Sequence, residues 1–258
     1  MNRFYENIPE LSSMKNYPKD LFYDGDLSLL KKPKISIIGS RKPTQYSRFI
    51  IKRLSGALSN AGVCVVSGGA MGIDATAHEG AGSSNTIAVL PCGIDQRYPS
   101  INKNLLNEIQ KNGLLLSQFE HGFRAAPWSF VVRNELVVAL GDSLIVGEAD
   151  IDGGSMRSVE FALKMKKEIY VLPQRLGESG GTNQLVKNSL AKVIYDIDEF
   201  VSMFSPSYAK NLKKDDFLDF CSTAPTYEEA LLKFPNRVFE AELGGEIEIK
   251  NGRILLIR

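Results

Sequence analysis

Short apolar runs alternate with segments of helical periodicity along most of this chain, and this alternation limits the folds that it can adopt. The apolar runs lie at residues 35–38, 63–66, 86–90, 114–116, 144–146, 169–172 and 192–195. Helical patterns fill the intervals, at residues 45–59, from 73 onward, 103–110, 130–140, 156–166 and 183–190. The first of these patterns predicts an inward face made of Phe49, Ile50, Leu54, Ala57 and Leu58. Apolar strands that are separated by helices form parallel sheets covered on both faces. With right-handed crossovers, the pattern predicts an α/β fold with a doubly wound, mostly parallel, Rossmann-like sheet.

The sequence also predicts how the chain divides. Residues 1–30 form a short lead segment, residues 31–204 hold the alternating core, and Pro, Ser and a charge run at 205–214 predict a linker. Residues 215–258 then carry helical patterns, one of them with Thr226 as its expected N-cap, and alternation on both sides of Asn251-Gly252. This dipeptide favours a two-residue hairpin. Three helices and a hairpin predict a small winged helix-turn-helix-like domain.

Composition excludes several classes of protein. The chain has 258 residues, of which 43% are hydrophobic and 24% charged, as in soluble globular proteins. Its apolar runs are too short to span a bilayer, so we expect no membrane partner. The three cysteines are far apart and lack C-x-x-C spacing, which favours reduced thiols and a cytoplasmic location. Two histidines provide no His-rich metal site, and we expect neither a metal nor a cofactor.

Positive charge is concentrated near the first strand. Residues 31–60 contain eight Lys and Arg and no Asp or Glu, although the whole chain carries a net charge of only +1. Residues 211–258 carry seven Lys and Arg against nine Asp and Glu, a net charge of −2. This distribution predicts a local anion site near the first strand. It argues against duplex DNA binding by the last segment and for a packing or partner role.

Two glycine-containing loops follow the first two strands, at the sheet edge where doubly wound folds bind ligands. Gly39-Ser40-Arg41 combines a tight turn, a hydroxyl and a guanidinium, and backbone N–H groups at a following helix start suit a phosphate. The second loop lets backbone approach a ligand closely, and its candidate residues are Ser67, Gly68, Gly69, Met71 and Gly72. Each loop alone also fits an ordinary turn or close strand–helix packing. The two together favour an anion pocket.

Two later segments extend the candidate site. Gly154 and Ser155 lie at a helix start after the fifth apolar run, and Phe130, Arg133 and Asn134 lie on an entering helix. Phe130 and Arg133 share a helix face, so a base can stack on the ring while the guanidinium binds a phosphate. A core position for the ring is the other interpretation. These loops provide phosphate-binding groups without a nucleophile or base, and we expect no catalytic residue.

Taken in order, these motifs resemble the DNA-processing protein A family, also called DprA or Smf. The matching stretches span residues 18–195 and read PKDLFYDGD, IIGSR, VVSGGAMGIDATAH, IAVLPCGIDQRYP, FVVRNELVVALGDSLIVGEA, GGSM and GGTNQLV. The resemblance implies a Rossmann-like core that binds and protects single-stranded DNA and forms a homodimer. It also implies a protein of natural transformation that helps to load a RecA-type recombinase and has no catalytic step. The DNA-pocket positions that it implies are Ser40, Arg41, residues 67–72, Phe130, Arg133, Asn134, Gly154 and Ser155.

The chain departs from the family pattern, and two alternatives stay open. Arg133-Asn134-Glu135 stands where the family has R-N-R, so one cation is lost, and residues 124–128 have no clear match. A nucleotide phosphoribohydrolase of the lysine-decarboxylase-like type shares such phosphate loops, but the stretch at 179–184 lacks the Glu of its P-G-G-x-G-T-x-x-E motif. A mononucleotide-binding module is the second alternative. A basic path that continues beyond one pocket would favour DNA instead.

Overall fold

In a computed structural model, residues 2–205, 208 and 216–257 are described, and contacts divide the chain into two units between residues 205 and 206. The linker predicted at 205–214 lies almost entirely outside the described residues. Within the described ranges, no helix is long and apolar enough to cross a membrane, and no cluster of metal-ligating side chains is present. Cys64, Cys92 and Cys221 are free, buried thiols.

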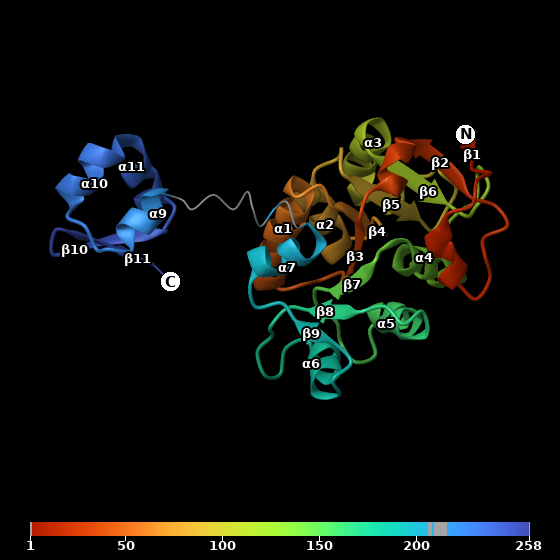
Figure 1. Ribbon diagram of the computed structural model, residues 1–258. Coiled ribbons are helices and arrows are strands. Elements are labelled where there is room, and N and C mark those ends of the chain that lie inside the picture. Colours follow the sequence, from red (N-terminus) through yellow and green to blue (C-terminus); the bar gives the residue numbers. More distant parts are fainter. Residues whose placement is uncertain (1, 206–207, 209–215, 258) are drawn as a thin grey trace. The chain divides into compact units, whose positions relative to one another are not determined.

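The first unit is built on a nine-stranded sheet with the order β1-β2-β6-β5-β4-β3-β7-β8-β9 (Figure 1). Its parallel strands are those that the sequence predicted: β3 (Lys34–Ile38), β4 (Cys64–Ser67), β5 (Thr86–Leu90), β6 (Leu114–Ser117), β7 (Ser143–Val146), β8 (Ile169–Val171) and β9 (Lys192–Val193). From β3 the order runs one way to β6 and the other way through β7 to β9. The doubly wound fold is therefore confirmed, and the strand order reverses between β3 and β7.

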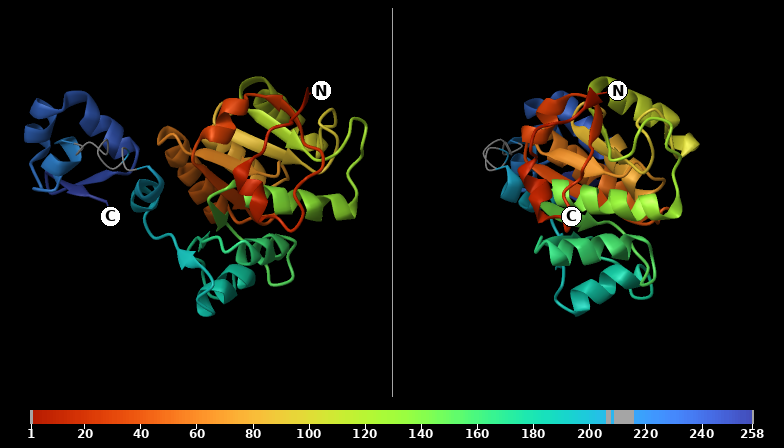
Figure 2. Two further views of the ribbon diagram at one scale, coloured as in Figure 1. Left: turned by 45° about the vertical axis from the view of Figure 1, so that its right-hand side comes forward. Right: turned by 90° about the vertical axis from the view of Figure 1, so that its right-hand side faces the viewer.

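Helices cover both faces of this sheet (Figure 2). One face carries α1 (Gln45–Asn60), α2 (Ile73–Ala81) and α3 (Lys103–Asn112), and the other carries α4 (Pro127–Leu140) and α5 (Ser155–Lys164). Strand residues alternate accordingly, since Val89 belongs to the core beneath α4 whereas Ala88 and Leu90 pack with α3. Helix α6 (Gly180–Lys187) follows β8, and α7 (Ile197–Phe204) follows β9.

Helix α1 buries Leu54 and Leu58, as the sequence predicted, but the rest of its buried face differs from the prediction. Phe49 was expected inside, but it is 60% exposed, and the guanidinium of Arg53 lies 5.6 Å from its ring centroid. Small side chains allow α1 and α2 to approach closely, since Ser55 packs against Gly80 and the Ser59 hydroxyl donates to the Ala81 carbonyl oxygen at 2.6 Å. Counting apolar residues does not detect the buried face of α1, because serines form part of it. Its buried residues are Ser47, Ile51, Leu54, Ser55 and Leu58.

The lead segment expected at residues 1–30 belongs, from residue 2 onward, to the sheet and its core. The short strand β1 (Asn2–Arg3) pairs antiparallel with β2 (Phe22–Gly25), and β2 pairs antiparallel with β6. Between them the 3-10 helix η1 (Pro9–Ser13) packs beside α4, as Figure 2 shows for the red segment next to the green helix. A second 3-10 helix, η2 (Leu27–Lys31), leads into β3.

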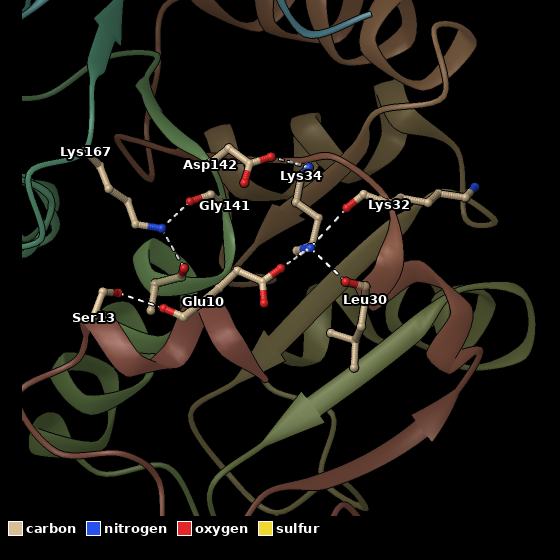
Figure 3. Close-up of polar contacts among 9 residues, drawn as sticks. Glu10, Ser13, Leu30, Lys32, Lys34, Gly141, Asp142 and Lys167 are labelled. Atoms are coloured by element: carbon tan, nitrogen blue, oxygen red, sulfur yellow. Dashed lines mark hydrogen bonds and ion pairs between the residues drawn. The ribbon is translucent and has the colours of Figure 1, made fainter. Parts of the chain in front are cut away.

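A buried lysine fastens this segment to the start of β3 (Figure 3). The Nζ of Lys34 donates to a Glu10 carboxylate oxygen at 2.6 Å and to the carbonyl oxygens of Leu30 and Lys32 at 2.8 and 3.0 Å. The Lys34 side chain is only 3% exposed. Its ammonium group therefore has three internal acceptors and is unavailable to an external anion.

The basic block at residues 31–60 is consequently not a single anion site. Lys31, Lys32 and Lys34 lie at the amino end of β3, whereas Arg41 and Lys42 follow its carboxyl end. The strand itself separates the two groups. This corrects the expectation that the block acts on one ligand, because only Arg41 and Lys42 directly follow the carboxyl end of β3, at the ligand-binding edge of the sheet.

Residues 216–257 of the second unit form three helices and a hairpin (Figure 1). They are α9 (Asp216–Cys221), α10 (Tyr227–Lys233), α11 (Pro235–Leu243), β10 (Ile247–Lys250) and β11 (Arg253–Leu256). Thr226 caps α10 as predicted, by accepting from the Glu229 N–H. Asn251 and Gly252 have φ values of +52° and +75°, which the predicted hairpin turn requires. The helices and the hairpin enclose a small core that includes Phe217 and Ile254.

Candidate functional site

An open cleft lies at the carboxyl ends of β3 and β7, where the strand order reverses. Its lining comes from the β3–α1 loop, the β7–α5 loop and the first turns of α4 and α5. A smaller pocket at one end adds Pro91, Tyr98 and the loop after β4. Sequence-predicted residues that line the cleft or the pocket are Gly39, Ser40, Arg41, Gly68, Met71, Phe130, Arg133, Asn134, Gly154 and Ser155.

Phe130 stands where the small pocket joins the larger cleft. Its ring is half-buried, and the guanidinium carbons of Arg41 and Arg133 lie 5.3 and 5.8 Å from the ring centroid. The ring of Tyr98, 46% exposed, packs edge-on at 5.7 Å. Cations at such distances are attracted to the ring face. Phe130 therefore belongs to an accessible wall instead of a sealed core.

Arg133 supports this wall from within the protein. It is 4% exposed, and its Nη1 donates to the Gly68 carbonyl oxygen and to that of Val89 at 3.3 Å. Its Nε donates to the Asn134 side-chain oxygen at 3.0 Å. These bonds commit the Arg133 guanidinium to the loop after β4. The exposed cation beside Phe130 is therefore Arg41.

The glycine-rich loop after β4 needs its glycines for close packing. A Cβ at Gly68 would overlap the Arg133 guanidinium and crowd the Asp74 carboxylate. At Gly72, whose φ is +81°, a Cβ would overlap the Ser40 carbonyl oxygen. Burial raises the pKa of the Asp74 carboxyl group, and the charge of Arg133 opposes that rise. The loop after β4 thus packs tightly against the Arg133 side chain on one side and the β3–α1 loop on the other.

Three predicted residues shape this loop without lining the cleft or the pocket: Ser67, Gly69 and Gly72. The Ser67 hydroxyl is buried and donates to the Ile37 carbonyl oxygen at 2.6 Å. The Gly69 carbonyl oxygen accepts from the Asn102 side-chain amide at 3.0 Å. Their polar groups are therefore committed to neighbouring segments.

The phosphate cradle expected at the start of α1 is occupied by the protein's own carboxylate. Glu148 Oε2 accepts from the Thr44 N–H and the Thr44 hydroxyl, both at 2.9 Å, and Thr44 Oγ1 accepts from the Ser47 N–H at 3.2 Å. An anion already sits at the positive end of the helix dipole. No sequence motif marks Glu148 for this role, because it comes from the loop after β7, far along the chain.

Helix α5, in contrast, begins in the cleft with an uncapped first turn. Gly154 makes no side-chain capping bond, and among the described residues the Ser158 hydroxyl, 1% exposed, has no hydrogen-bond partner. Arg157 is exposed and lies 3.2 Å from Glu160. The sequence marked Gly154 and Ser155 but not Arg157 or Ser158, since Ser and Arg are common on helix surfaces. An unpaired hydroxyl and a cation thus lie together at the start of α5, a helix N-terminus that suits a phosphate, although the Met156 and Arg157 N–H groups already donate to the Gly153 and Gly154 carbonyl oxygens.

Comparison with known proteins gives concordant matches. The family model described as DNA recombination-mediator protein A matches residues 3–205. The DNA processing protein DprA of Streptococcus pneumoniae (strain ATCC BAA-255 / R6) is 33% identical over 199 residues, which cover 76% of this chain and 70% of that protein. That of Bacillus subtilis (strain 168) is 31% identical, covering 73% and 65%. A solved structure of DNA processing protein A from Helicobacter pylori, described for its unique single-stranded DNA binding mode, has 40% identity and a TM-score of 0.78, covering 80% of this chain and 96% of that one.

Proposed function

The chain belongs to the DNA recombination-mediator protein A family, and on that premise we propose that it binds single-stranded DNA in the cleft between β3 and β7. The observation that carries the proposal is the placement of Arg41 over the accessible ring of Phe130, 5.3 Å from its centroid. The ring can stack on the base of a nucleotide, and the cation beside it can bind the phosphate. The H. pylori structure, described for its single-stranded DNA binding mode, supports the same ligand class.

Binding in this cleft requires Arg41 to change its contacts. Arg133 is buried and reaches Phe130 from the protein side, whereas Arg41 is exposed. An entering base displaces Arg41 from the ring face, and the guanidinium then binds a backbone phosphate through its two-pronged donor geometry. A second phosphate binds at the start of α5, where Gly154, Ser155 and Arg157 supply donors. Two phosphate positions favour a polynucleotide over the mononucleotide alternative.

We propose binding without catalysis. The described lining of the cleft contains serines and aspartates but no His, Cys, Lys or Glu, so it holds no Ser–His or Cys–His pair for nucleophilic catalysis. The stretch considered for a phosphoribohydrolase, residues 179–184, lies at the start of α6, outside this lining. Ser179 and Thr182 there are buried and bonded to each other at 2.7 Å. The DNA-binding proposal is therefore preferred to the enzyme alternative.

The wider role follows from the family alone. We propose a cytoplasmic homodimer that protects single strands entering by natural transformation and helps to load a RecA-type recombinase. The second unit, which we propose is a winged-helix-like domain with a net charge of −2 over residues 211–258, serves packing or a protein partner. These roles remain proposals, because the chain spans 70% and 65% of the two DprA relatives compared above.

The DNA proposal is tested by fluorescence anisotropy with single-stranded, duplex and mononucleotide ligands at two salt concentrations. Arg41→Glu is expected to weaken single-strand binding about 10- to 150-fold, the equivalent of a charged hydrogen bond of about 1.5–3 kcal/mol. Loss of one phosphate contact should also reduce the log–log salt slope by about 0.7. Lys52→Glu is the matched control, because Lys52 is exposed on α1 and does not line the cleft. Equal effects of both substitutions would refute a site at Arg41.

A further inference from the structure

The loop between β6 and α4 carries an aromatic cluster that the cleft does not use. Trp128 is 55% exposed, and its ring centroid lies 5.6 Å from Phe119 and 5.5 Å from Phe123. Phe119 is buried and Phe123 is half-buried. Tryptophan is the largest apolar side chain and is usually mostly buried. A tryptophan that packs against two rings and is still more than half exposed is therefore unusual.

Both phenylalanine rings lie on one side of Trp128. Phe119 and Phe123 stack on each other, with centroids 4.6 Å apart and planes 12° apart. The Trp128 ring centroid is almost equally distant from both, so the indole lies beside the stack, with its plane tilted by 73° and 67° to theirs. Such tilted aromatic contacts are favourable, and they leave Trp128 55% exposed.

The loop that presents this ring is held in place by hydrogen bonds. The Gly93 N–H donates to the Phe123 carbonyl oxygen, and the Gly122 N–H donates to Asp95 Oδ1, both at 2.9 Å. The Ser129 hydroxyl donates to the Pro91 carbonyl oxygen at 2.6 Å. A ring in a preformed loop loses little conformational entropy when a ligand stacks on it.

Trp128 also borders the cleft without sharing the Phe130 position. Its neighbours Pro127 and Val131 line the cleft. Residues 128 and 130 point to nearly opposite sides of a helix, because each residue advances the helix by about 100°. One nucleotide therefore cannot use both rings, whereas a strand that leaves the cleft around the start of α4 meets them in turn.

We propose that Trp128 is a second base-stacking position, which continues the single-strand path from the Phe130 pocket onto the β6–α4 loop. The proposal rests on the proposed function, because it names a further part of the same binding site. A nucleobase is favoured as the occupant because the exposed ring borders the cleft and because Arg124, an exposed cation, lies in the loop just before α4 for a neighbouring phosphate. Stacking on an aromatic face tolerates every base, as a path for any sequence requires.

Intrinsic fluorescence gives a direct test, since Trp128 is the single tryptophan of the chain. Oligothymidylates of about 4 and about 16 nucleotides, the range of single-strand site sizes, are titrated into the full-length protein. Binding is followed in parallel by anisotropy of an end label. The longer strand is expected to quench Trp128, while the shorter strand binds the Phe130 pocket with little quenching. Binding of the longer strand by anisotropy with unchanged tryptophan fluorescence would overturn the proposal and leave the proposed function intact.

Substitutions give an independent readout by anisotropy. Trp128→Ala is expected to weaken the longer strand about 5- to 150-fold and to leave the shorter strand within about twofold. Trp128→Phe keeps an aromatic face and should restore most of the affinity. Phe49→Ala is the matched control, because Phe49 is a comparably exposed ring outside the site.

The remaining outcomes also discriminate. An equal loss for both strand lengths would show that Trp128 acts only through the pocket or the fold, and no loss for either would show that no base stacks on it. Both results overturn the proposal. Absence of binding to any oligonucleotide by the unsubstituted protein would instead overturn the proposed function together with this inference.

Discussion

His78 should make the first unit lose stability as the pH falls. The residue is fully buried on α2, and its Nδ1 lies 2.7 Å from the Thr86 hydroxyl, which donates onward to the Val65 carbonyl oxygen at 2.8 Å. The Thr86 oxygen therefore accepts a proton from Nδ1–H, and Nε2 is left as a buried acceptor without a partner among the described residues. Burial, helped by the nearby charge of Arg133, lowers the pKa of His78 from 6.5 to about 3.

The sign and size of the effect follow from linkage. The unfolded chain takes up the proton near pH 6.5 and the folded chain only near pH 3, so acid favours the unfolded state between these values. This pKa difference corresponds to a loss of about 2.5 kcal/mol of unfolding free energy between pH 6 and pH 4, and of about 5 kcal/mol in total. Asp74 acts in the opposite direction, because its raised pKa favours the folded state at low pH.

His78→Asn is the informative substitution, since an amide can replace the Nδ1–H donor but does not titrate. Urea unfolding followed by circular dichroism at pH 6, 5 and 4 should show a shallower pH dependence in this variant than in the parent, by about 2.5 kcal/mol over that range. Asp74 remains in both proteins, so the difference isolates His78. His121→Asn is the control, because His121 is the other histidine and its side chain is 70% exposed. Identical pH profiles for the parent and His78→Asn would refute the argument.

Three further changes test other parts of the structure. Phe130→Ala should weaken single-strand binding by about 1–3 kcal/mol while changing the unfolding free energy little; a loss of about 3–5 kcal/mol of stability would instead identify a core ring. Glu10→Gln should cost about 2 kcal/mol in urea unfolding, because the Lys34 ammonium group loses its charged acceptor. Deletion of residues 206–258 should leave the sedimentation behaviour of the proposed dimer unchanged, and a monomeric core beside a dimeric full chain would place the interface in the second unit.

The parallel core could be predicted because its strands are continuous apolar runs, such as residues 86–90, that fit a sheet buried on both faces. Strand β2 could not, since Phe22-Tyr23-Asp24-Gly25 is neither apolar throughout nor regularly alternating. Lys34 was counted in the basic block of the predicted anion site because the sequence does not show that Glu10 and two carbonyl oxygens surround it. Phe49 was placed inside because aromatic residues usually are.

The parts of the candidate site that could be predicted are those marked by glycine-containing loops or by an aromatic residue and a cation on one helix face. The Gly39 and Gly68 loops and the Phe130–Arg133 spacing gave such signals, and the structure brings them to one cleft. The sequence could not tell which cation is free, because the burial of Arg133 depends on carbonyl oxygens of other strands. Nor could it show that Glu148 fills the start of α1, since that contact joins two loops far apart along the chain.

The antiparallel pairing of β2 with β6 bears on the order in which the chain folds during synthesis. Phe22 pairs with Ser117 and Gly25 with Leu114, so β2 has only the two-residue strand β1 as a partner until β6, which follows β3 to β5, has been made. Closing such a long loop costs entropy before any contact compensates for it, and pairing of this kind is slow. The segment around β2 is made before the strand that it joins and is therefore among the last to dock. Until it does, Leu11 and Met14 stay outside the core, and this stretch is the part of the nascent chain most open to chaperones and proteases.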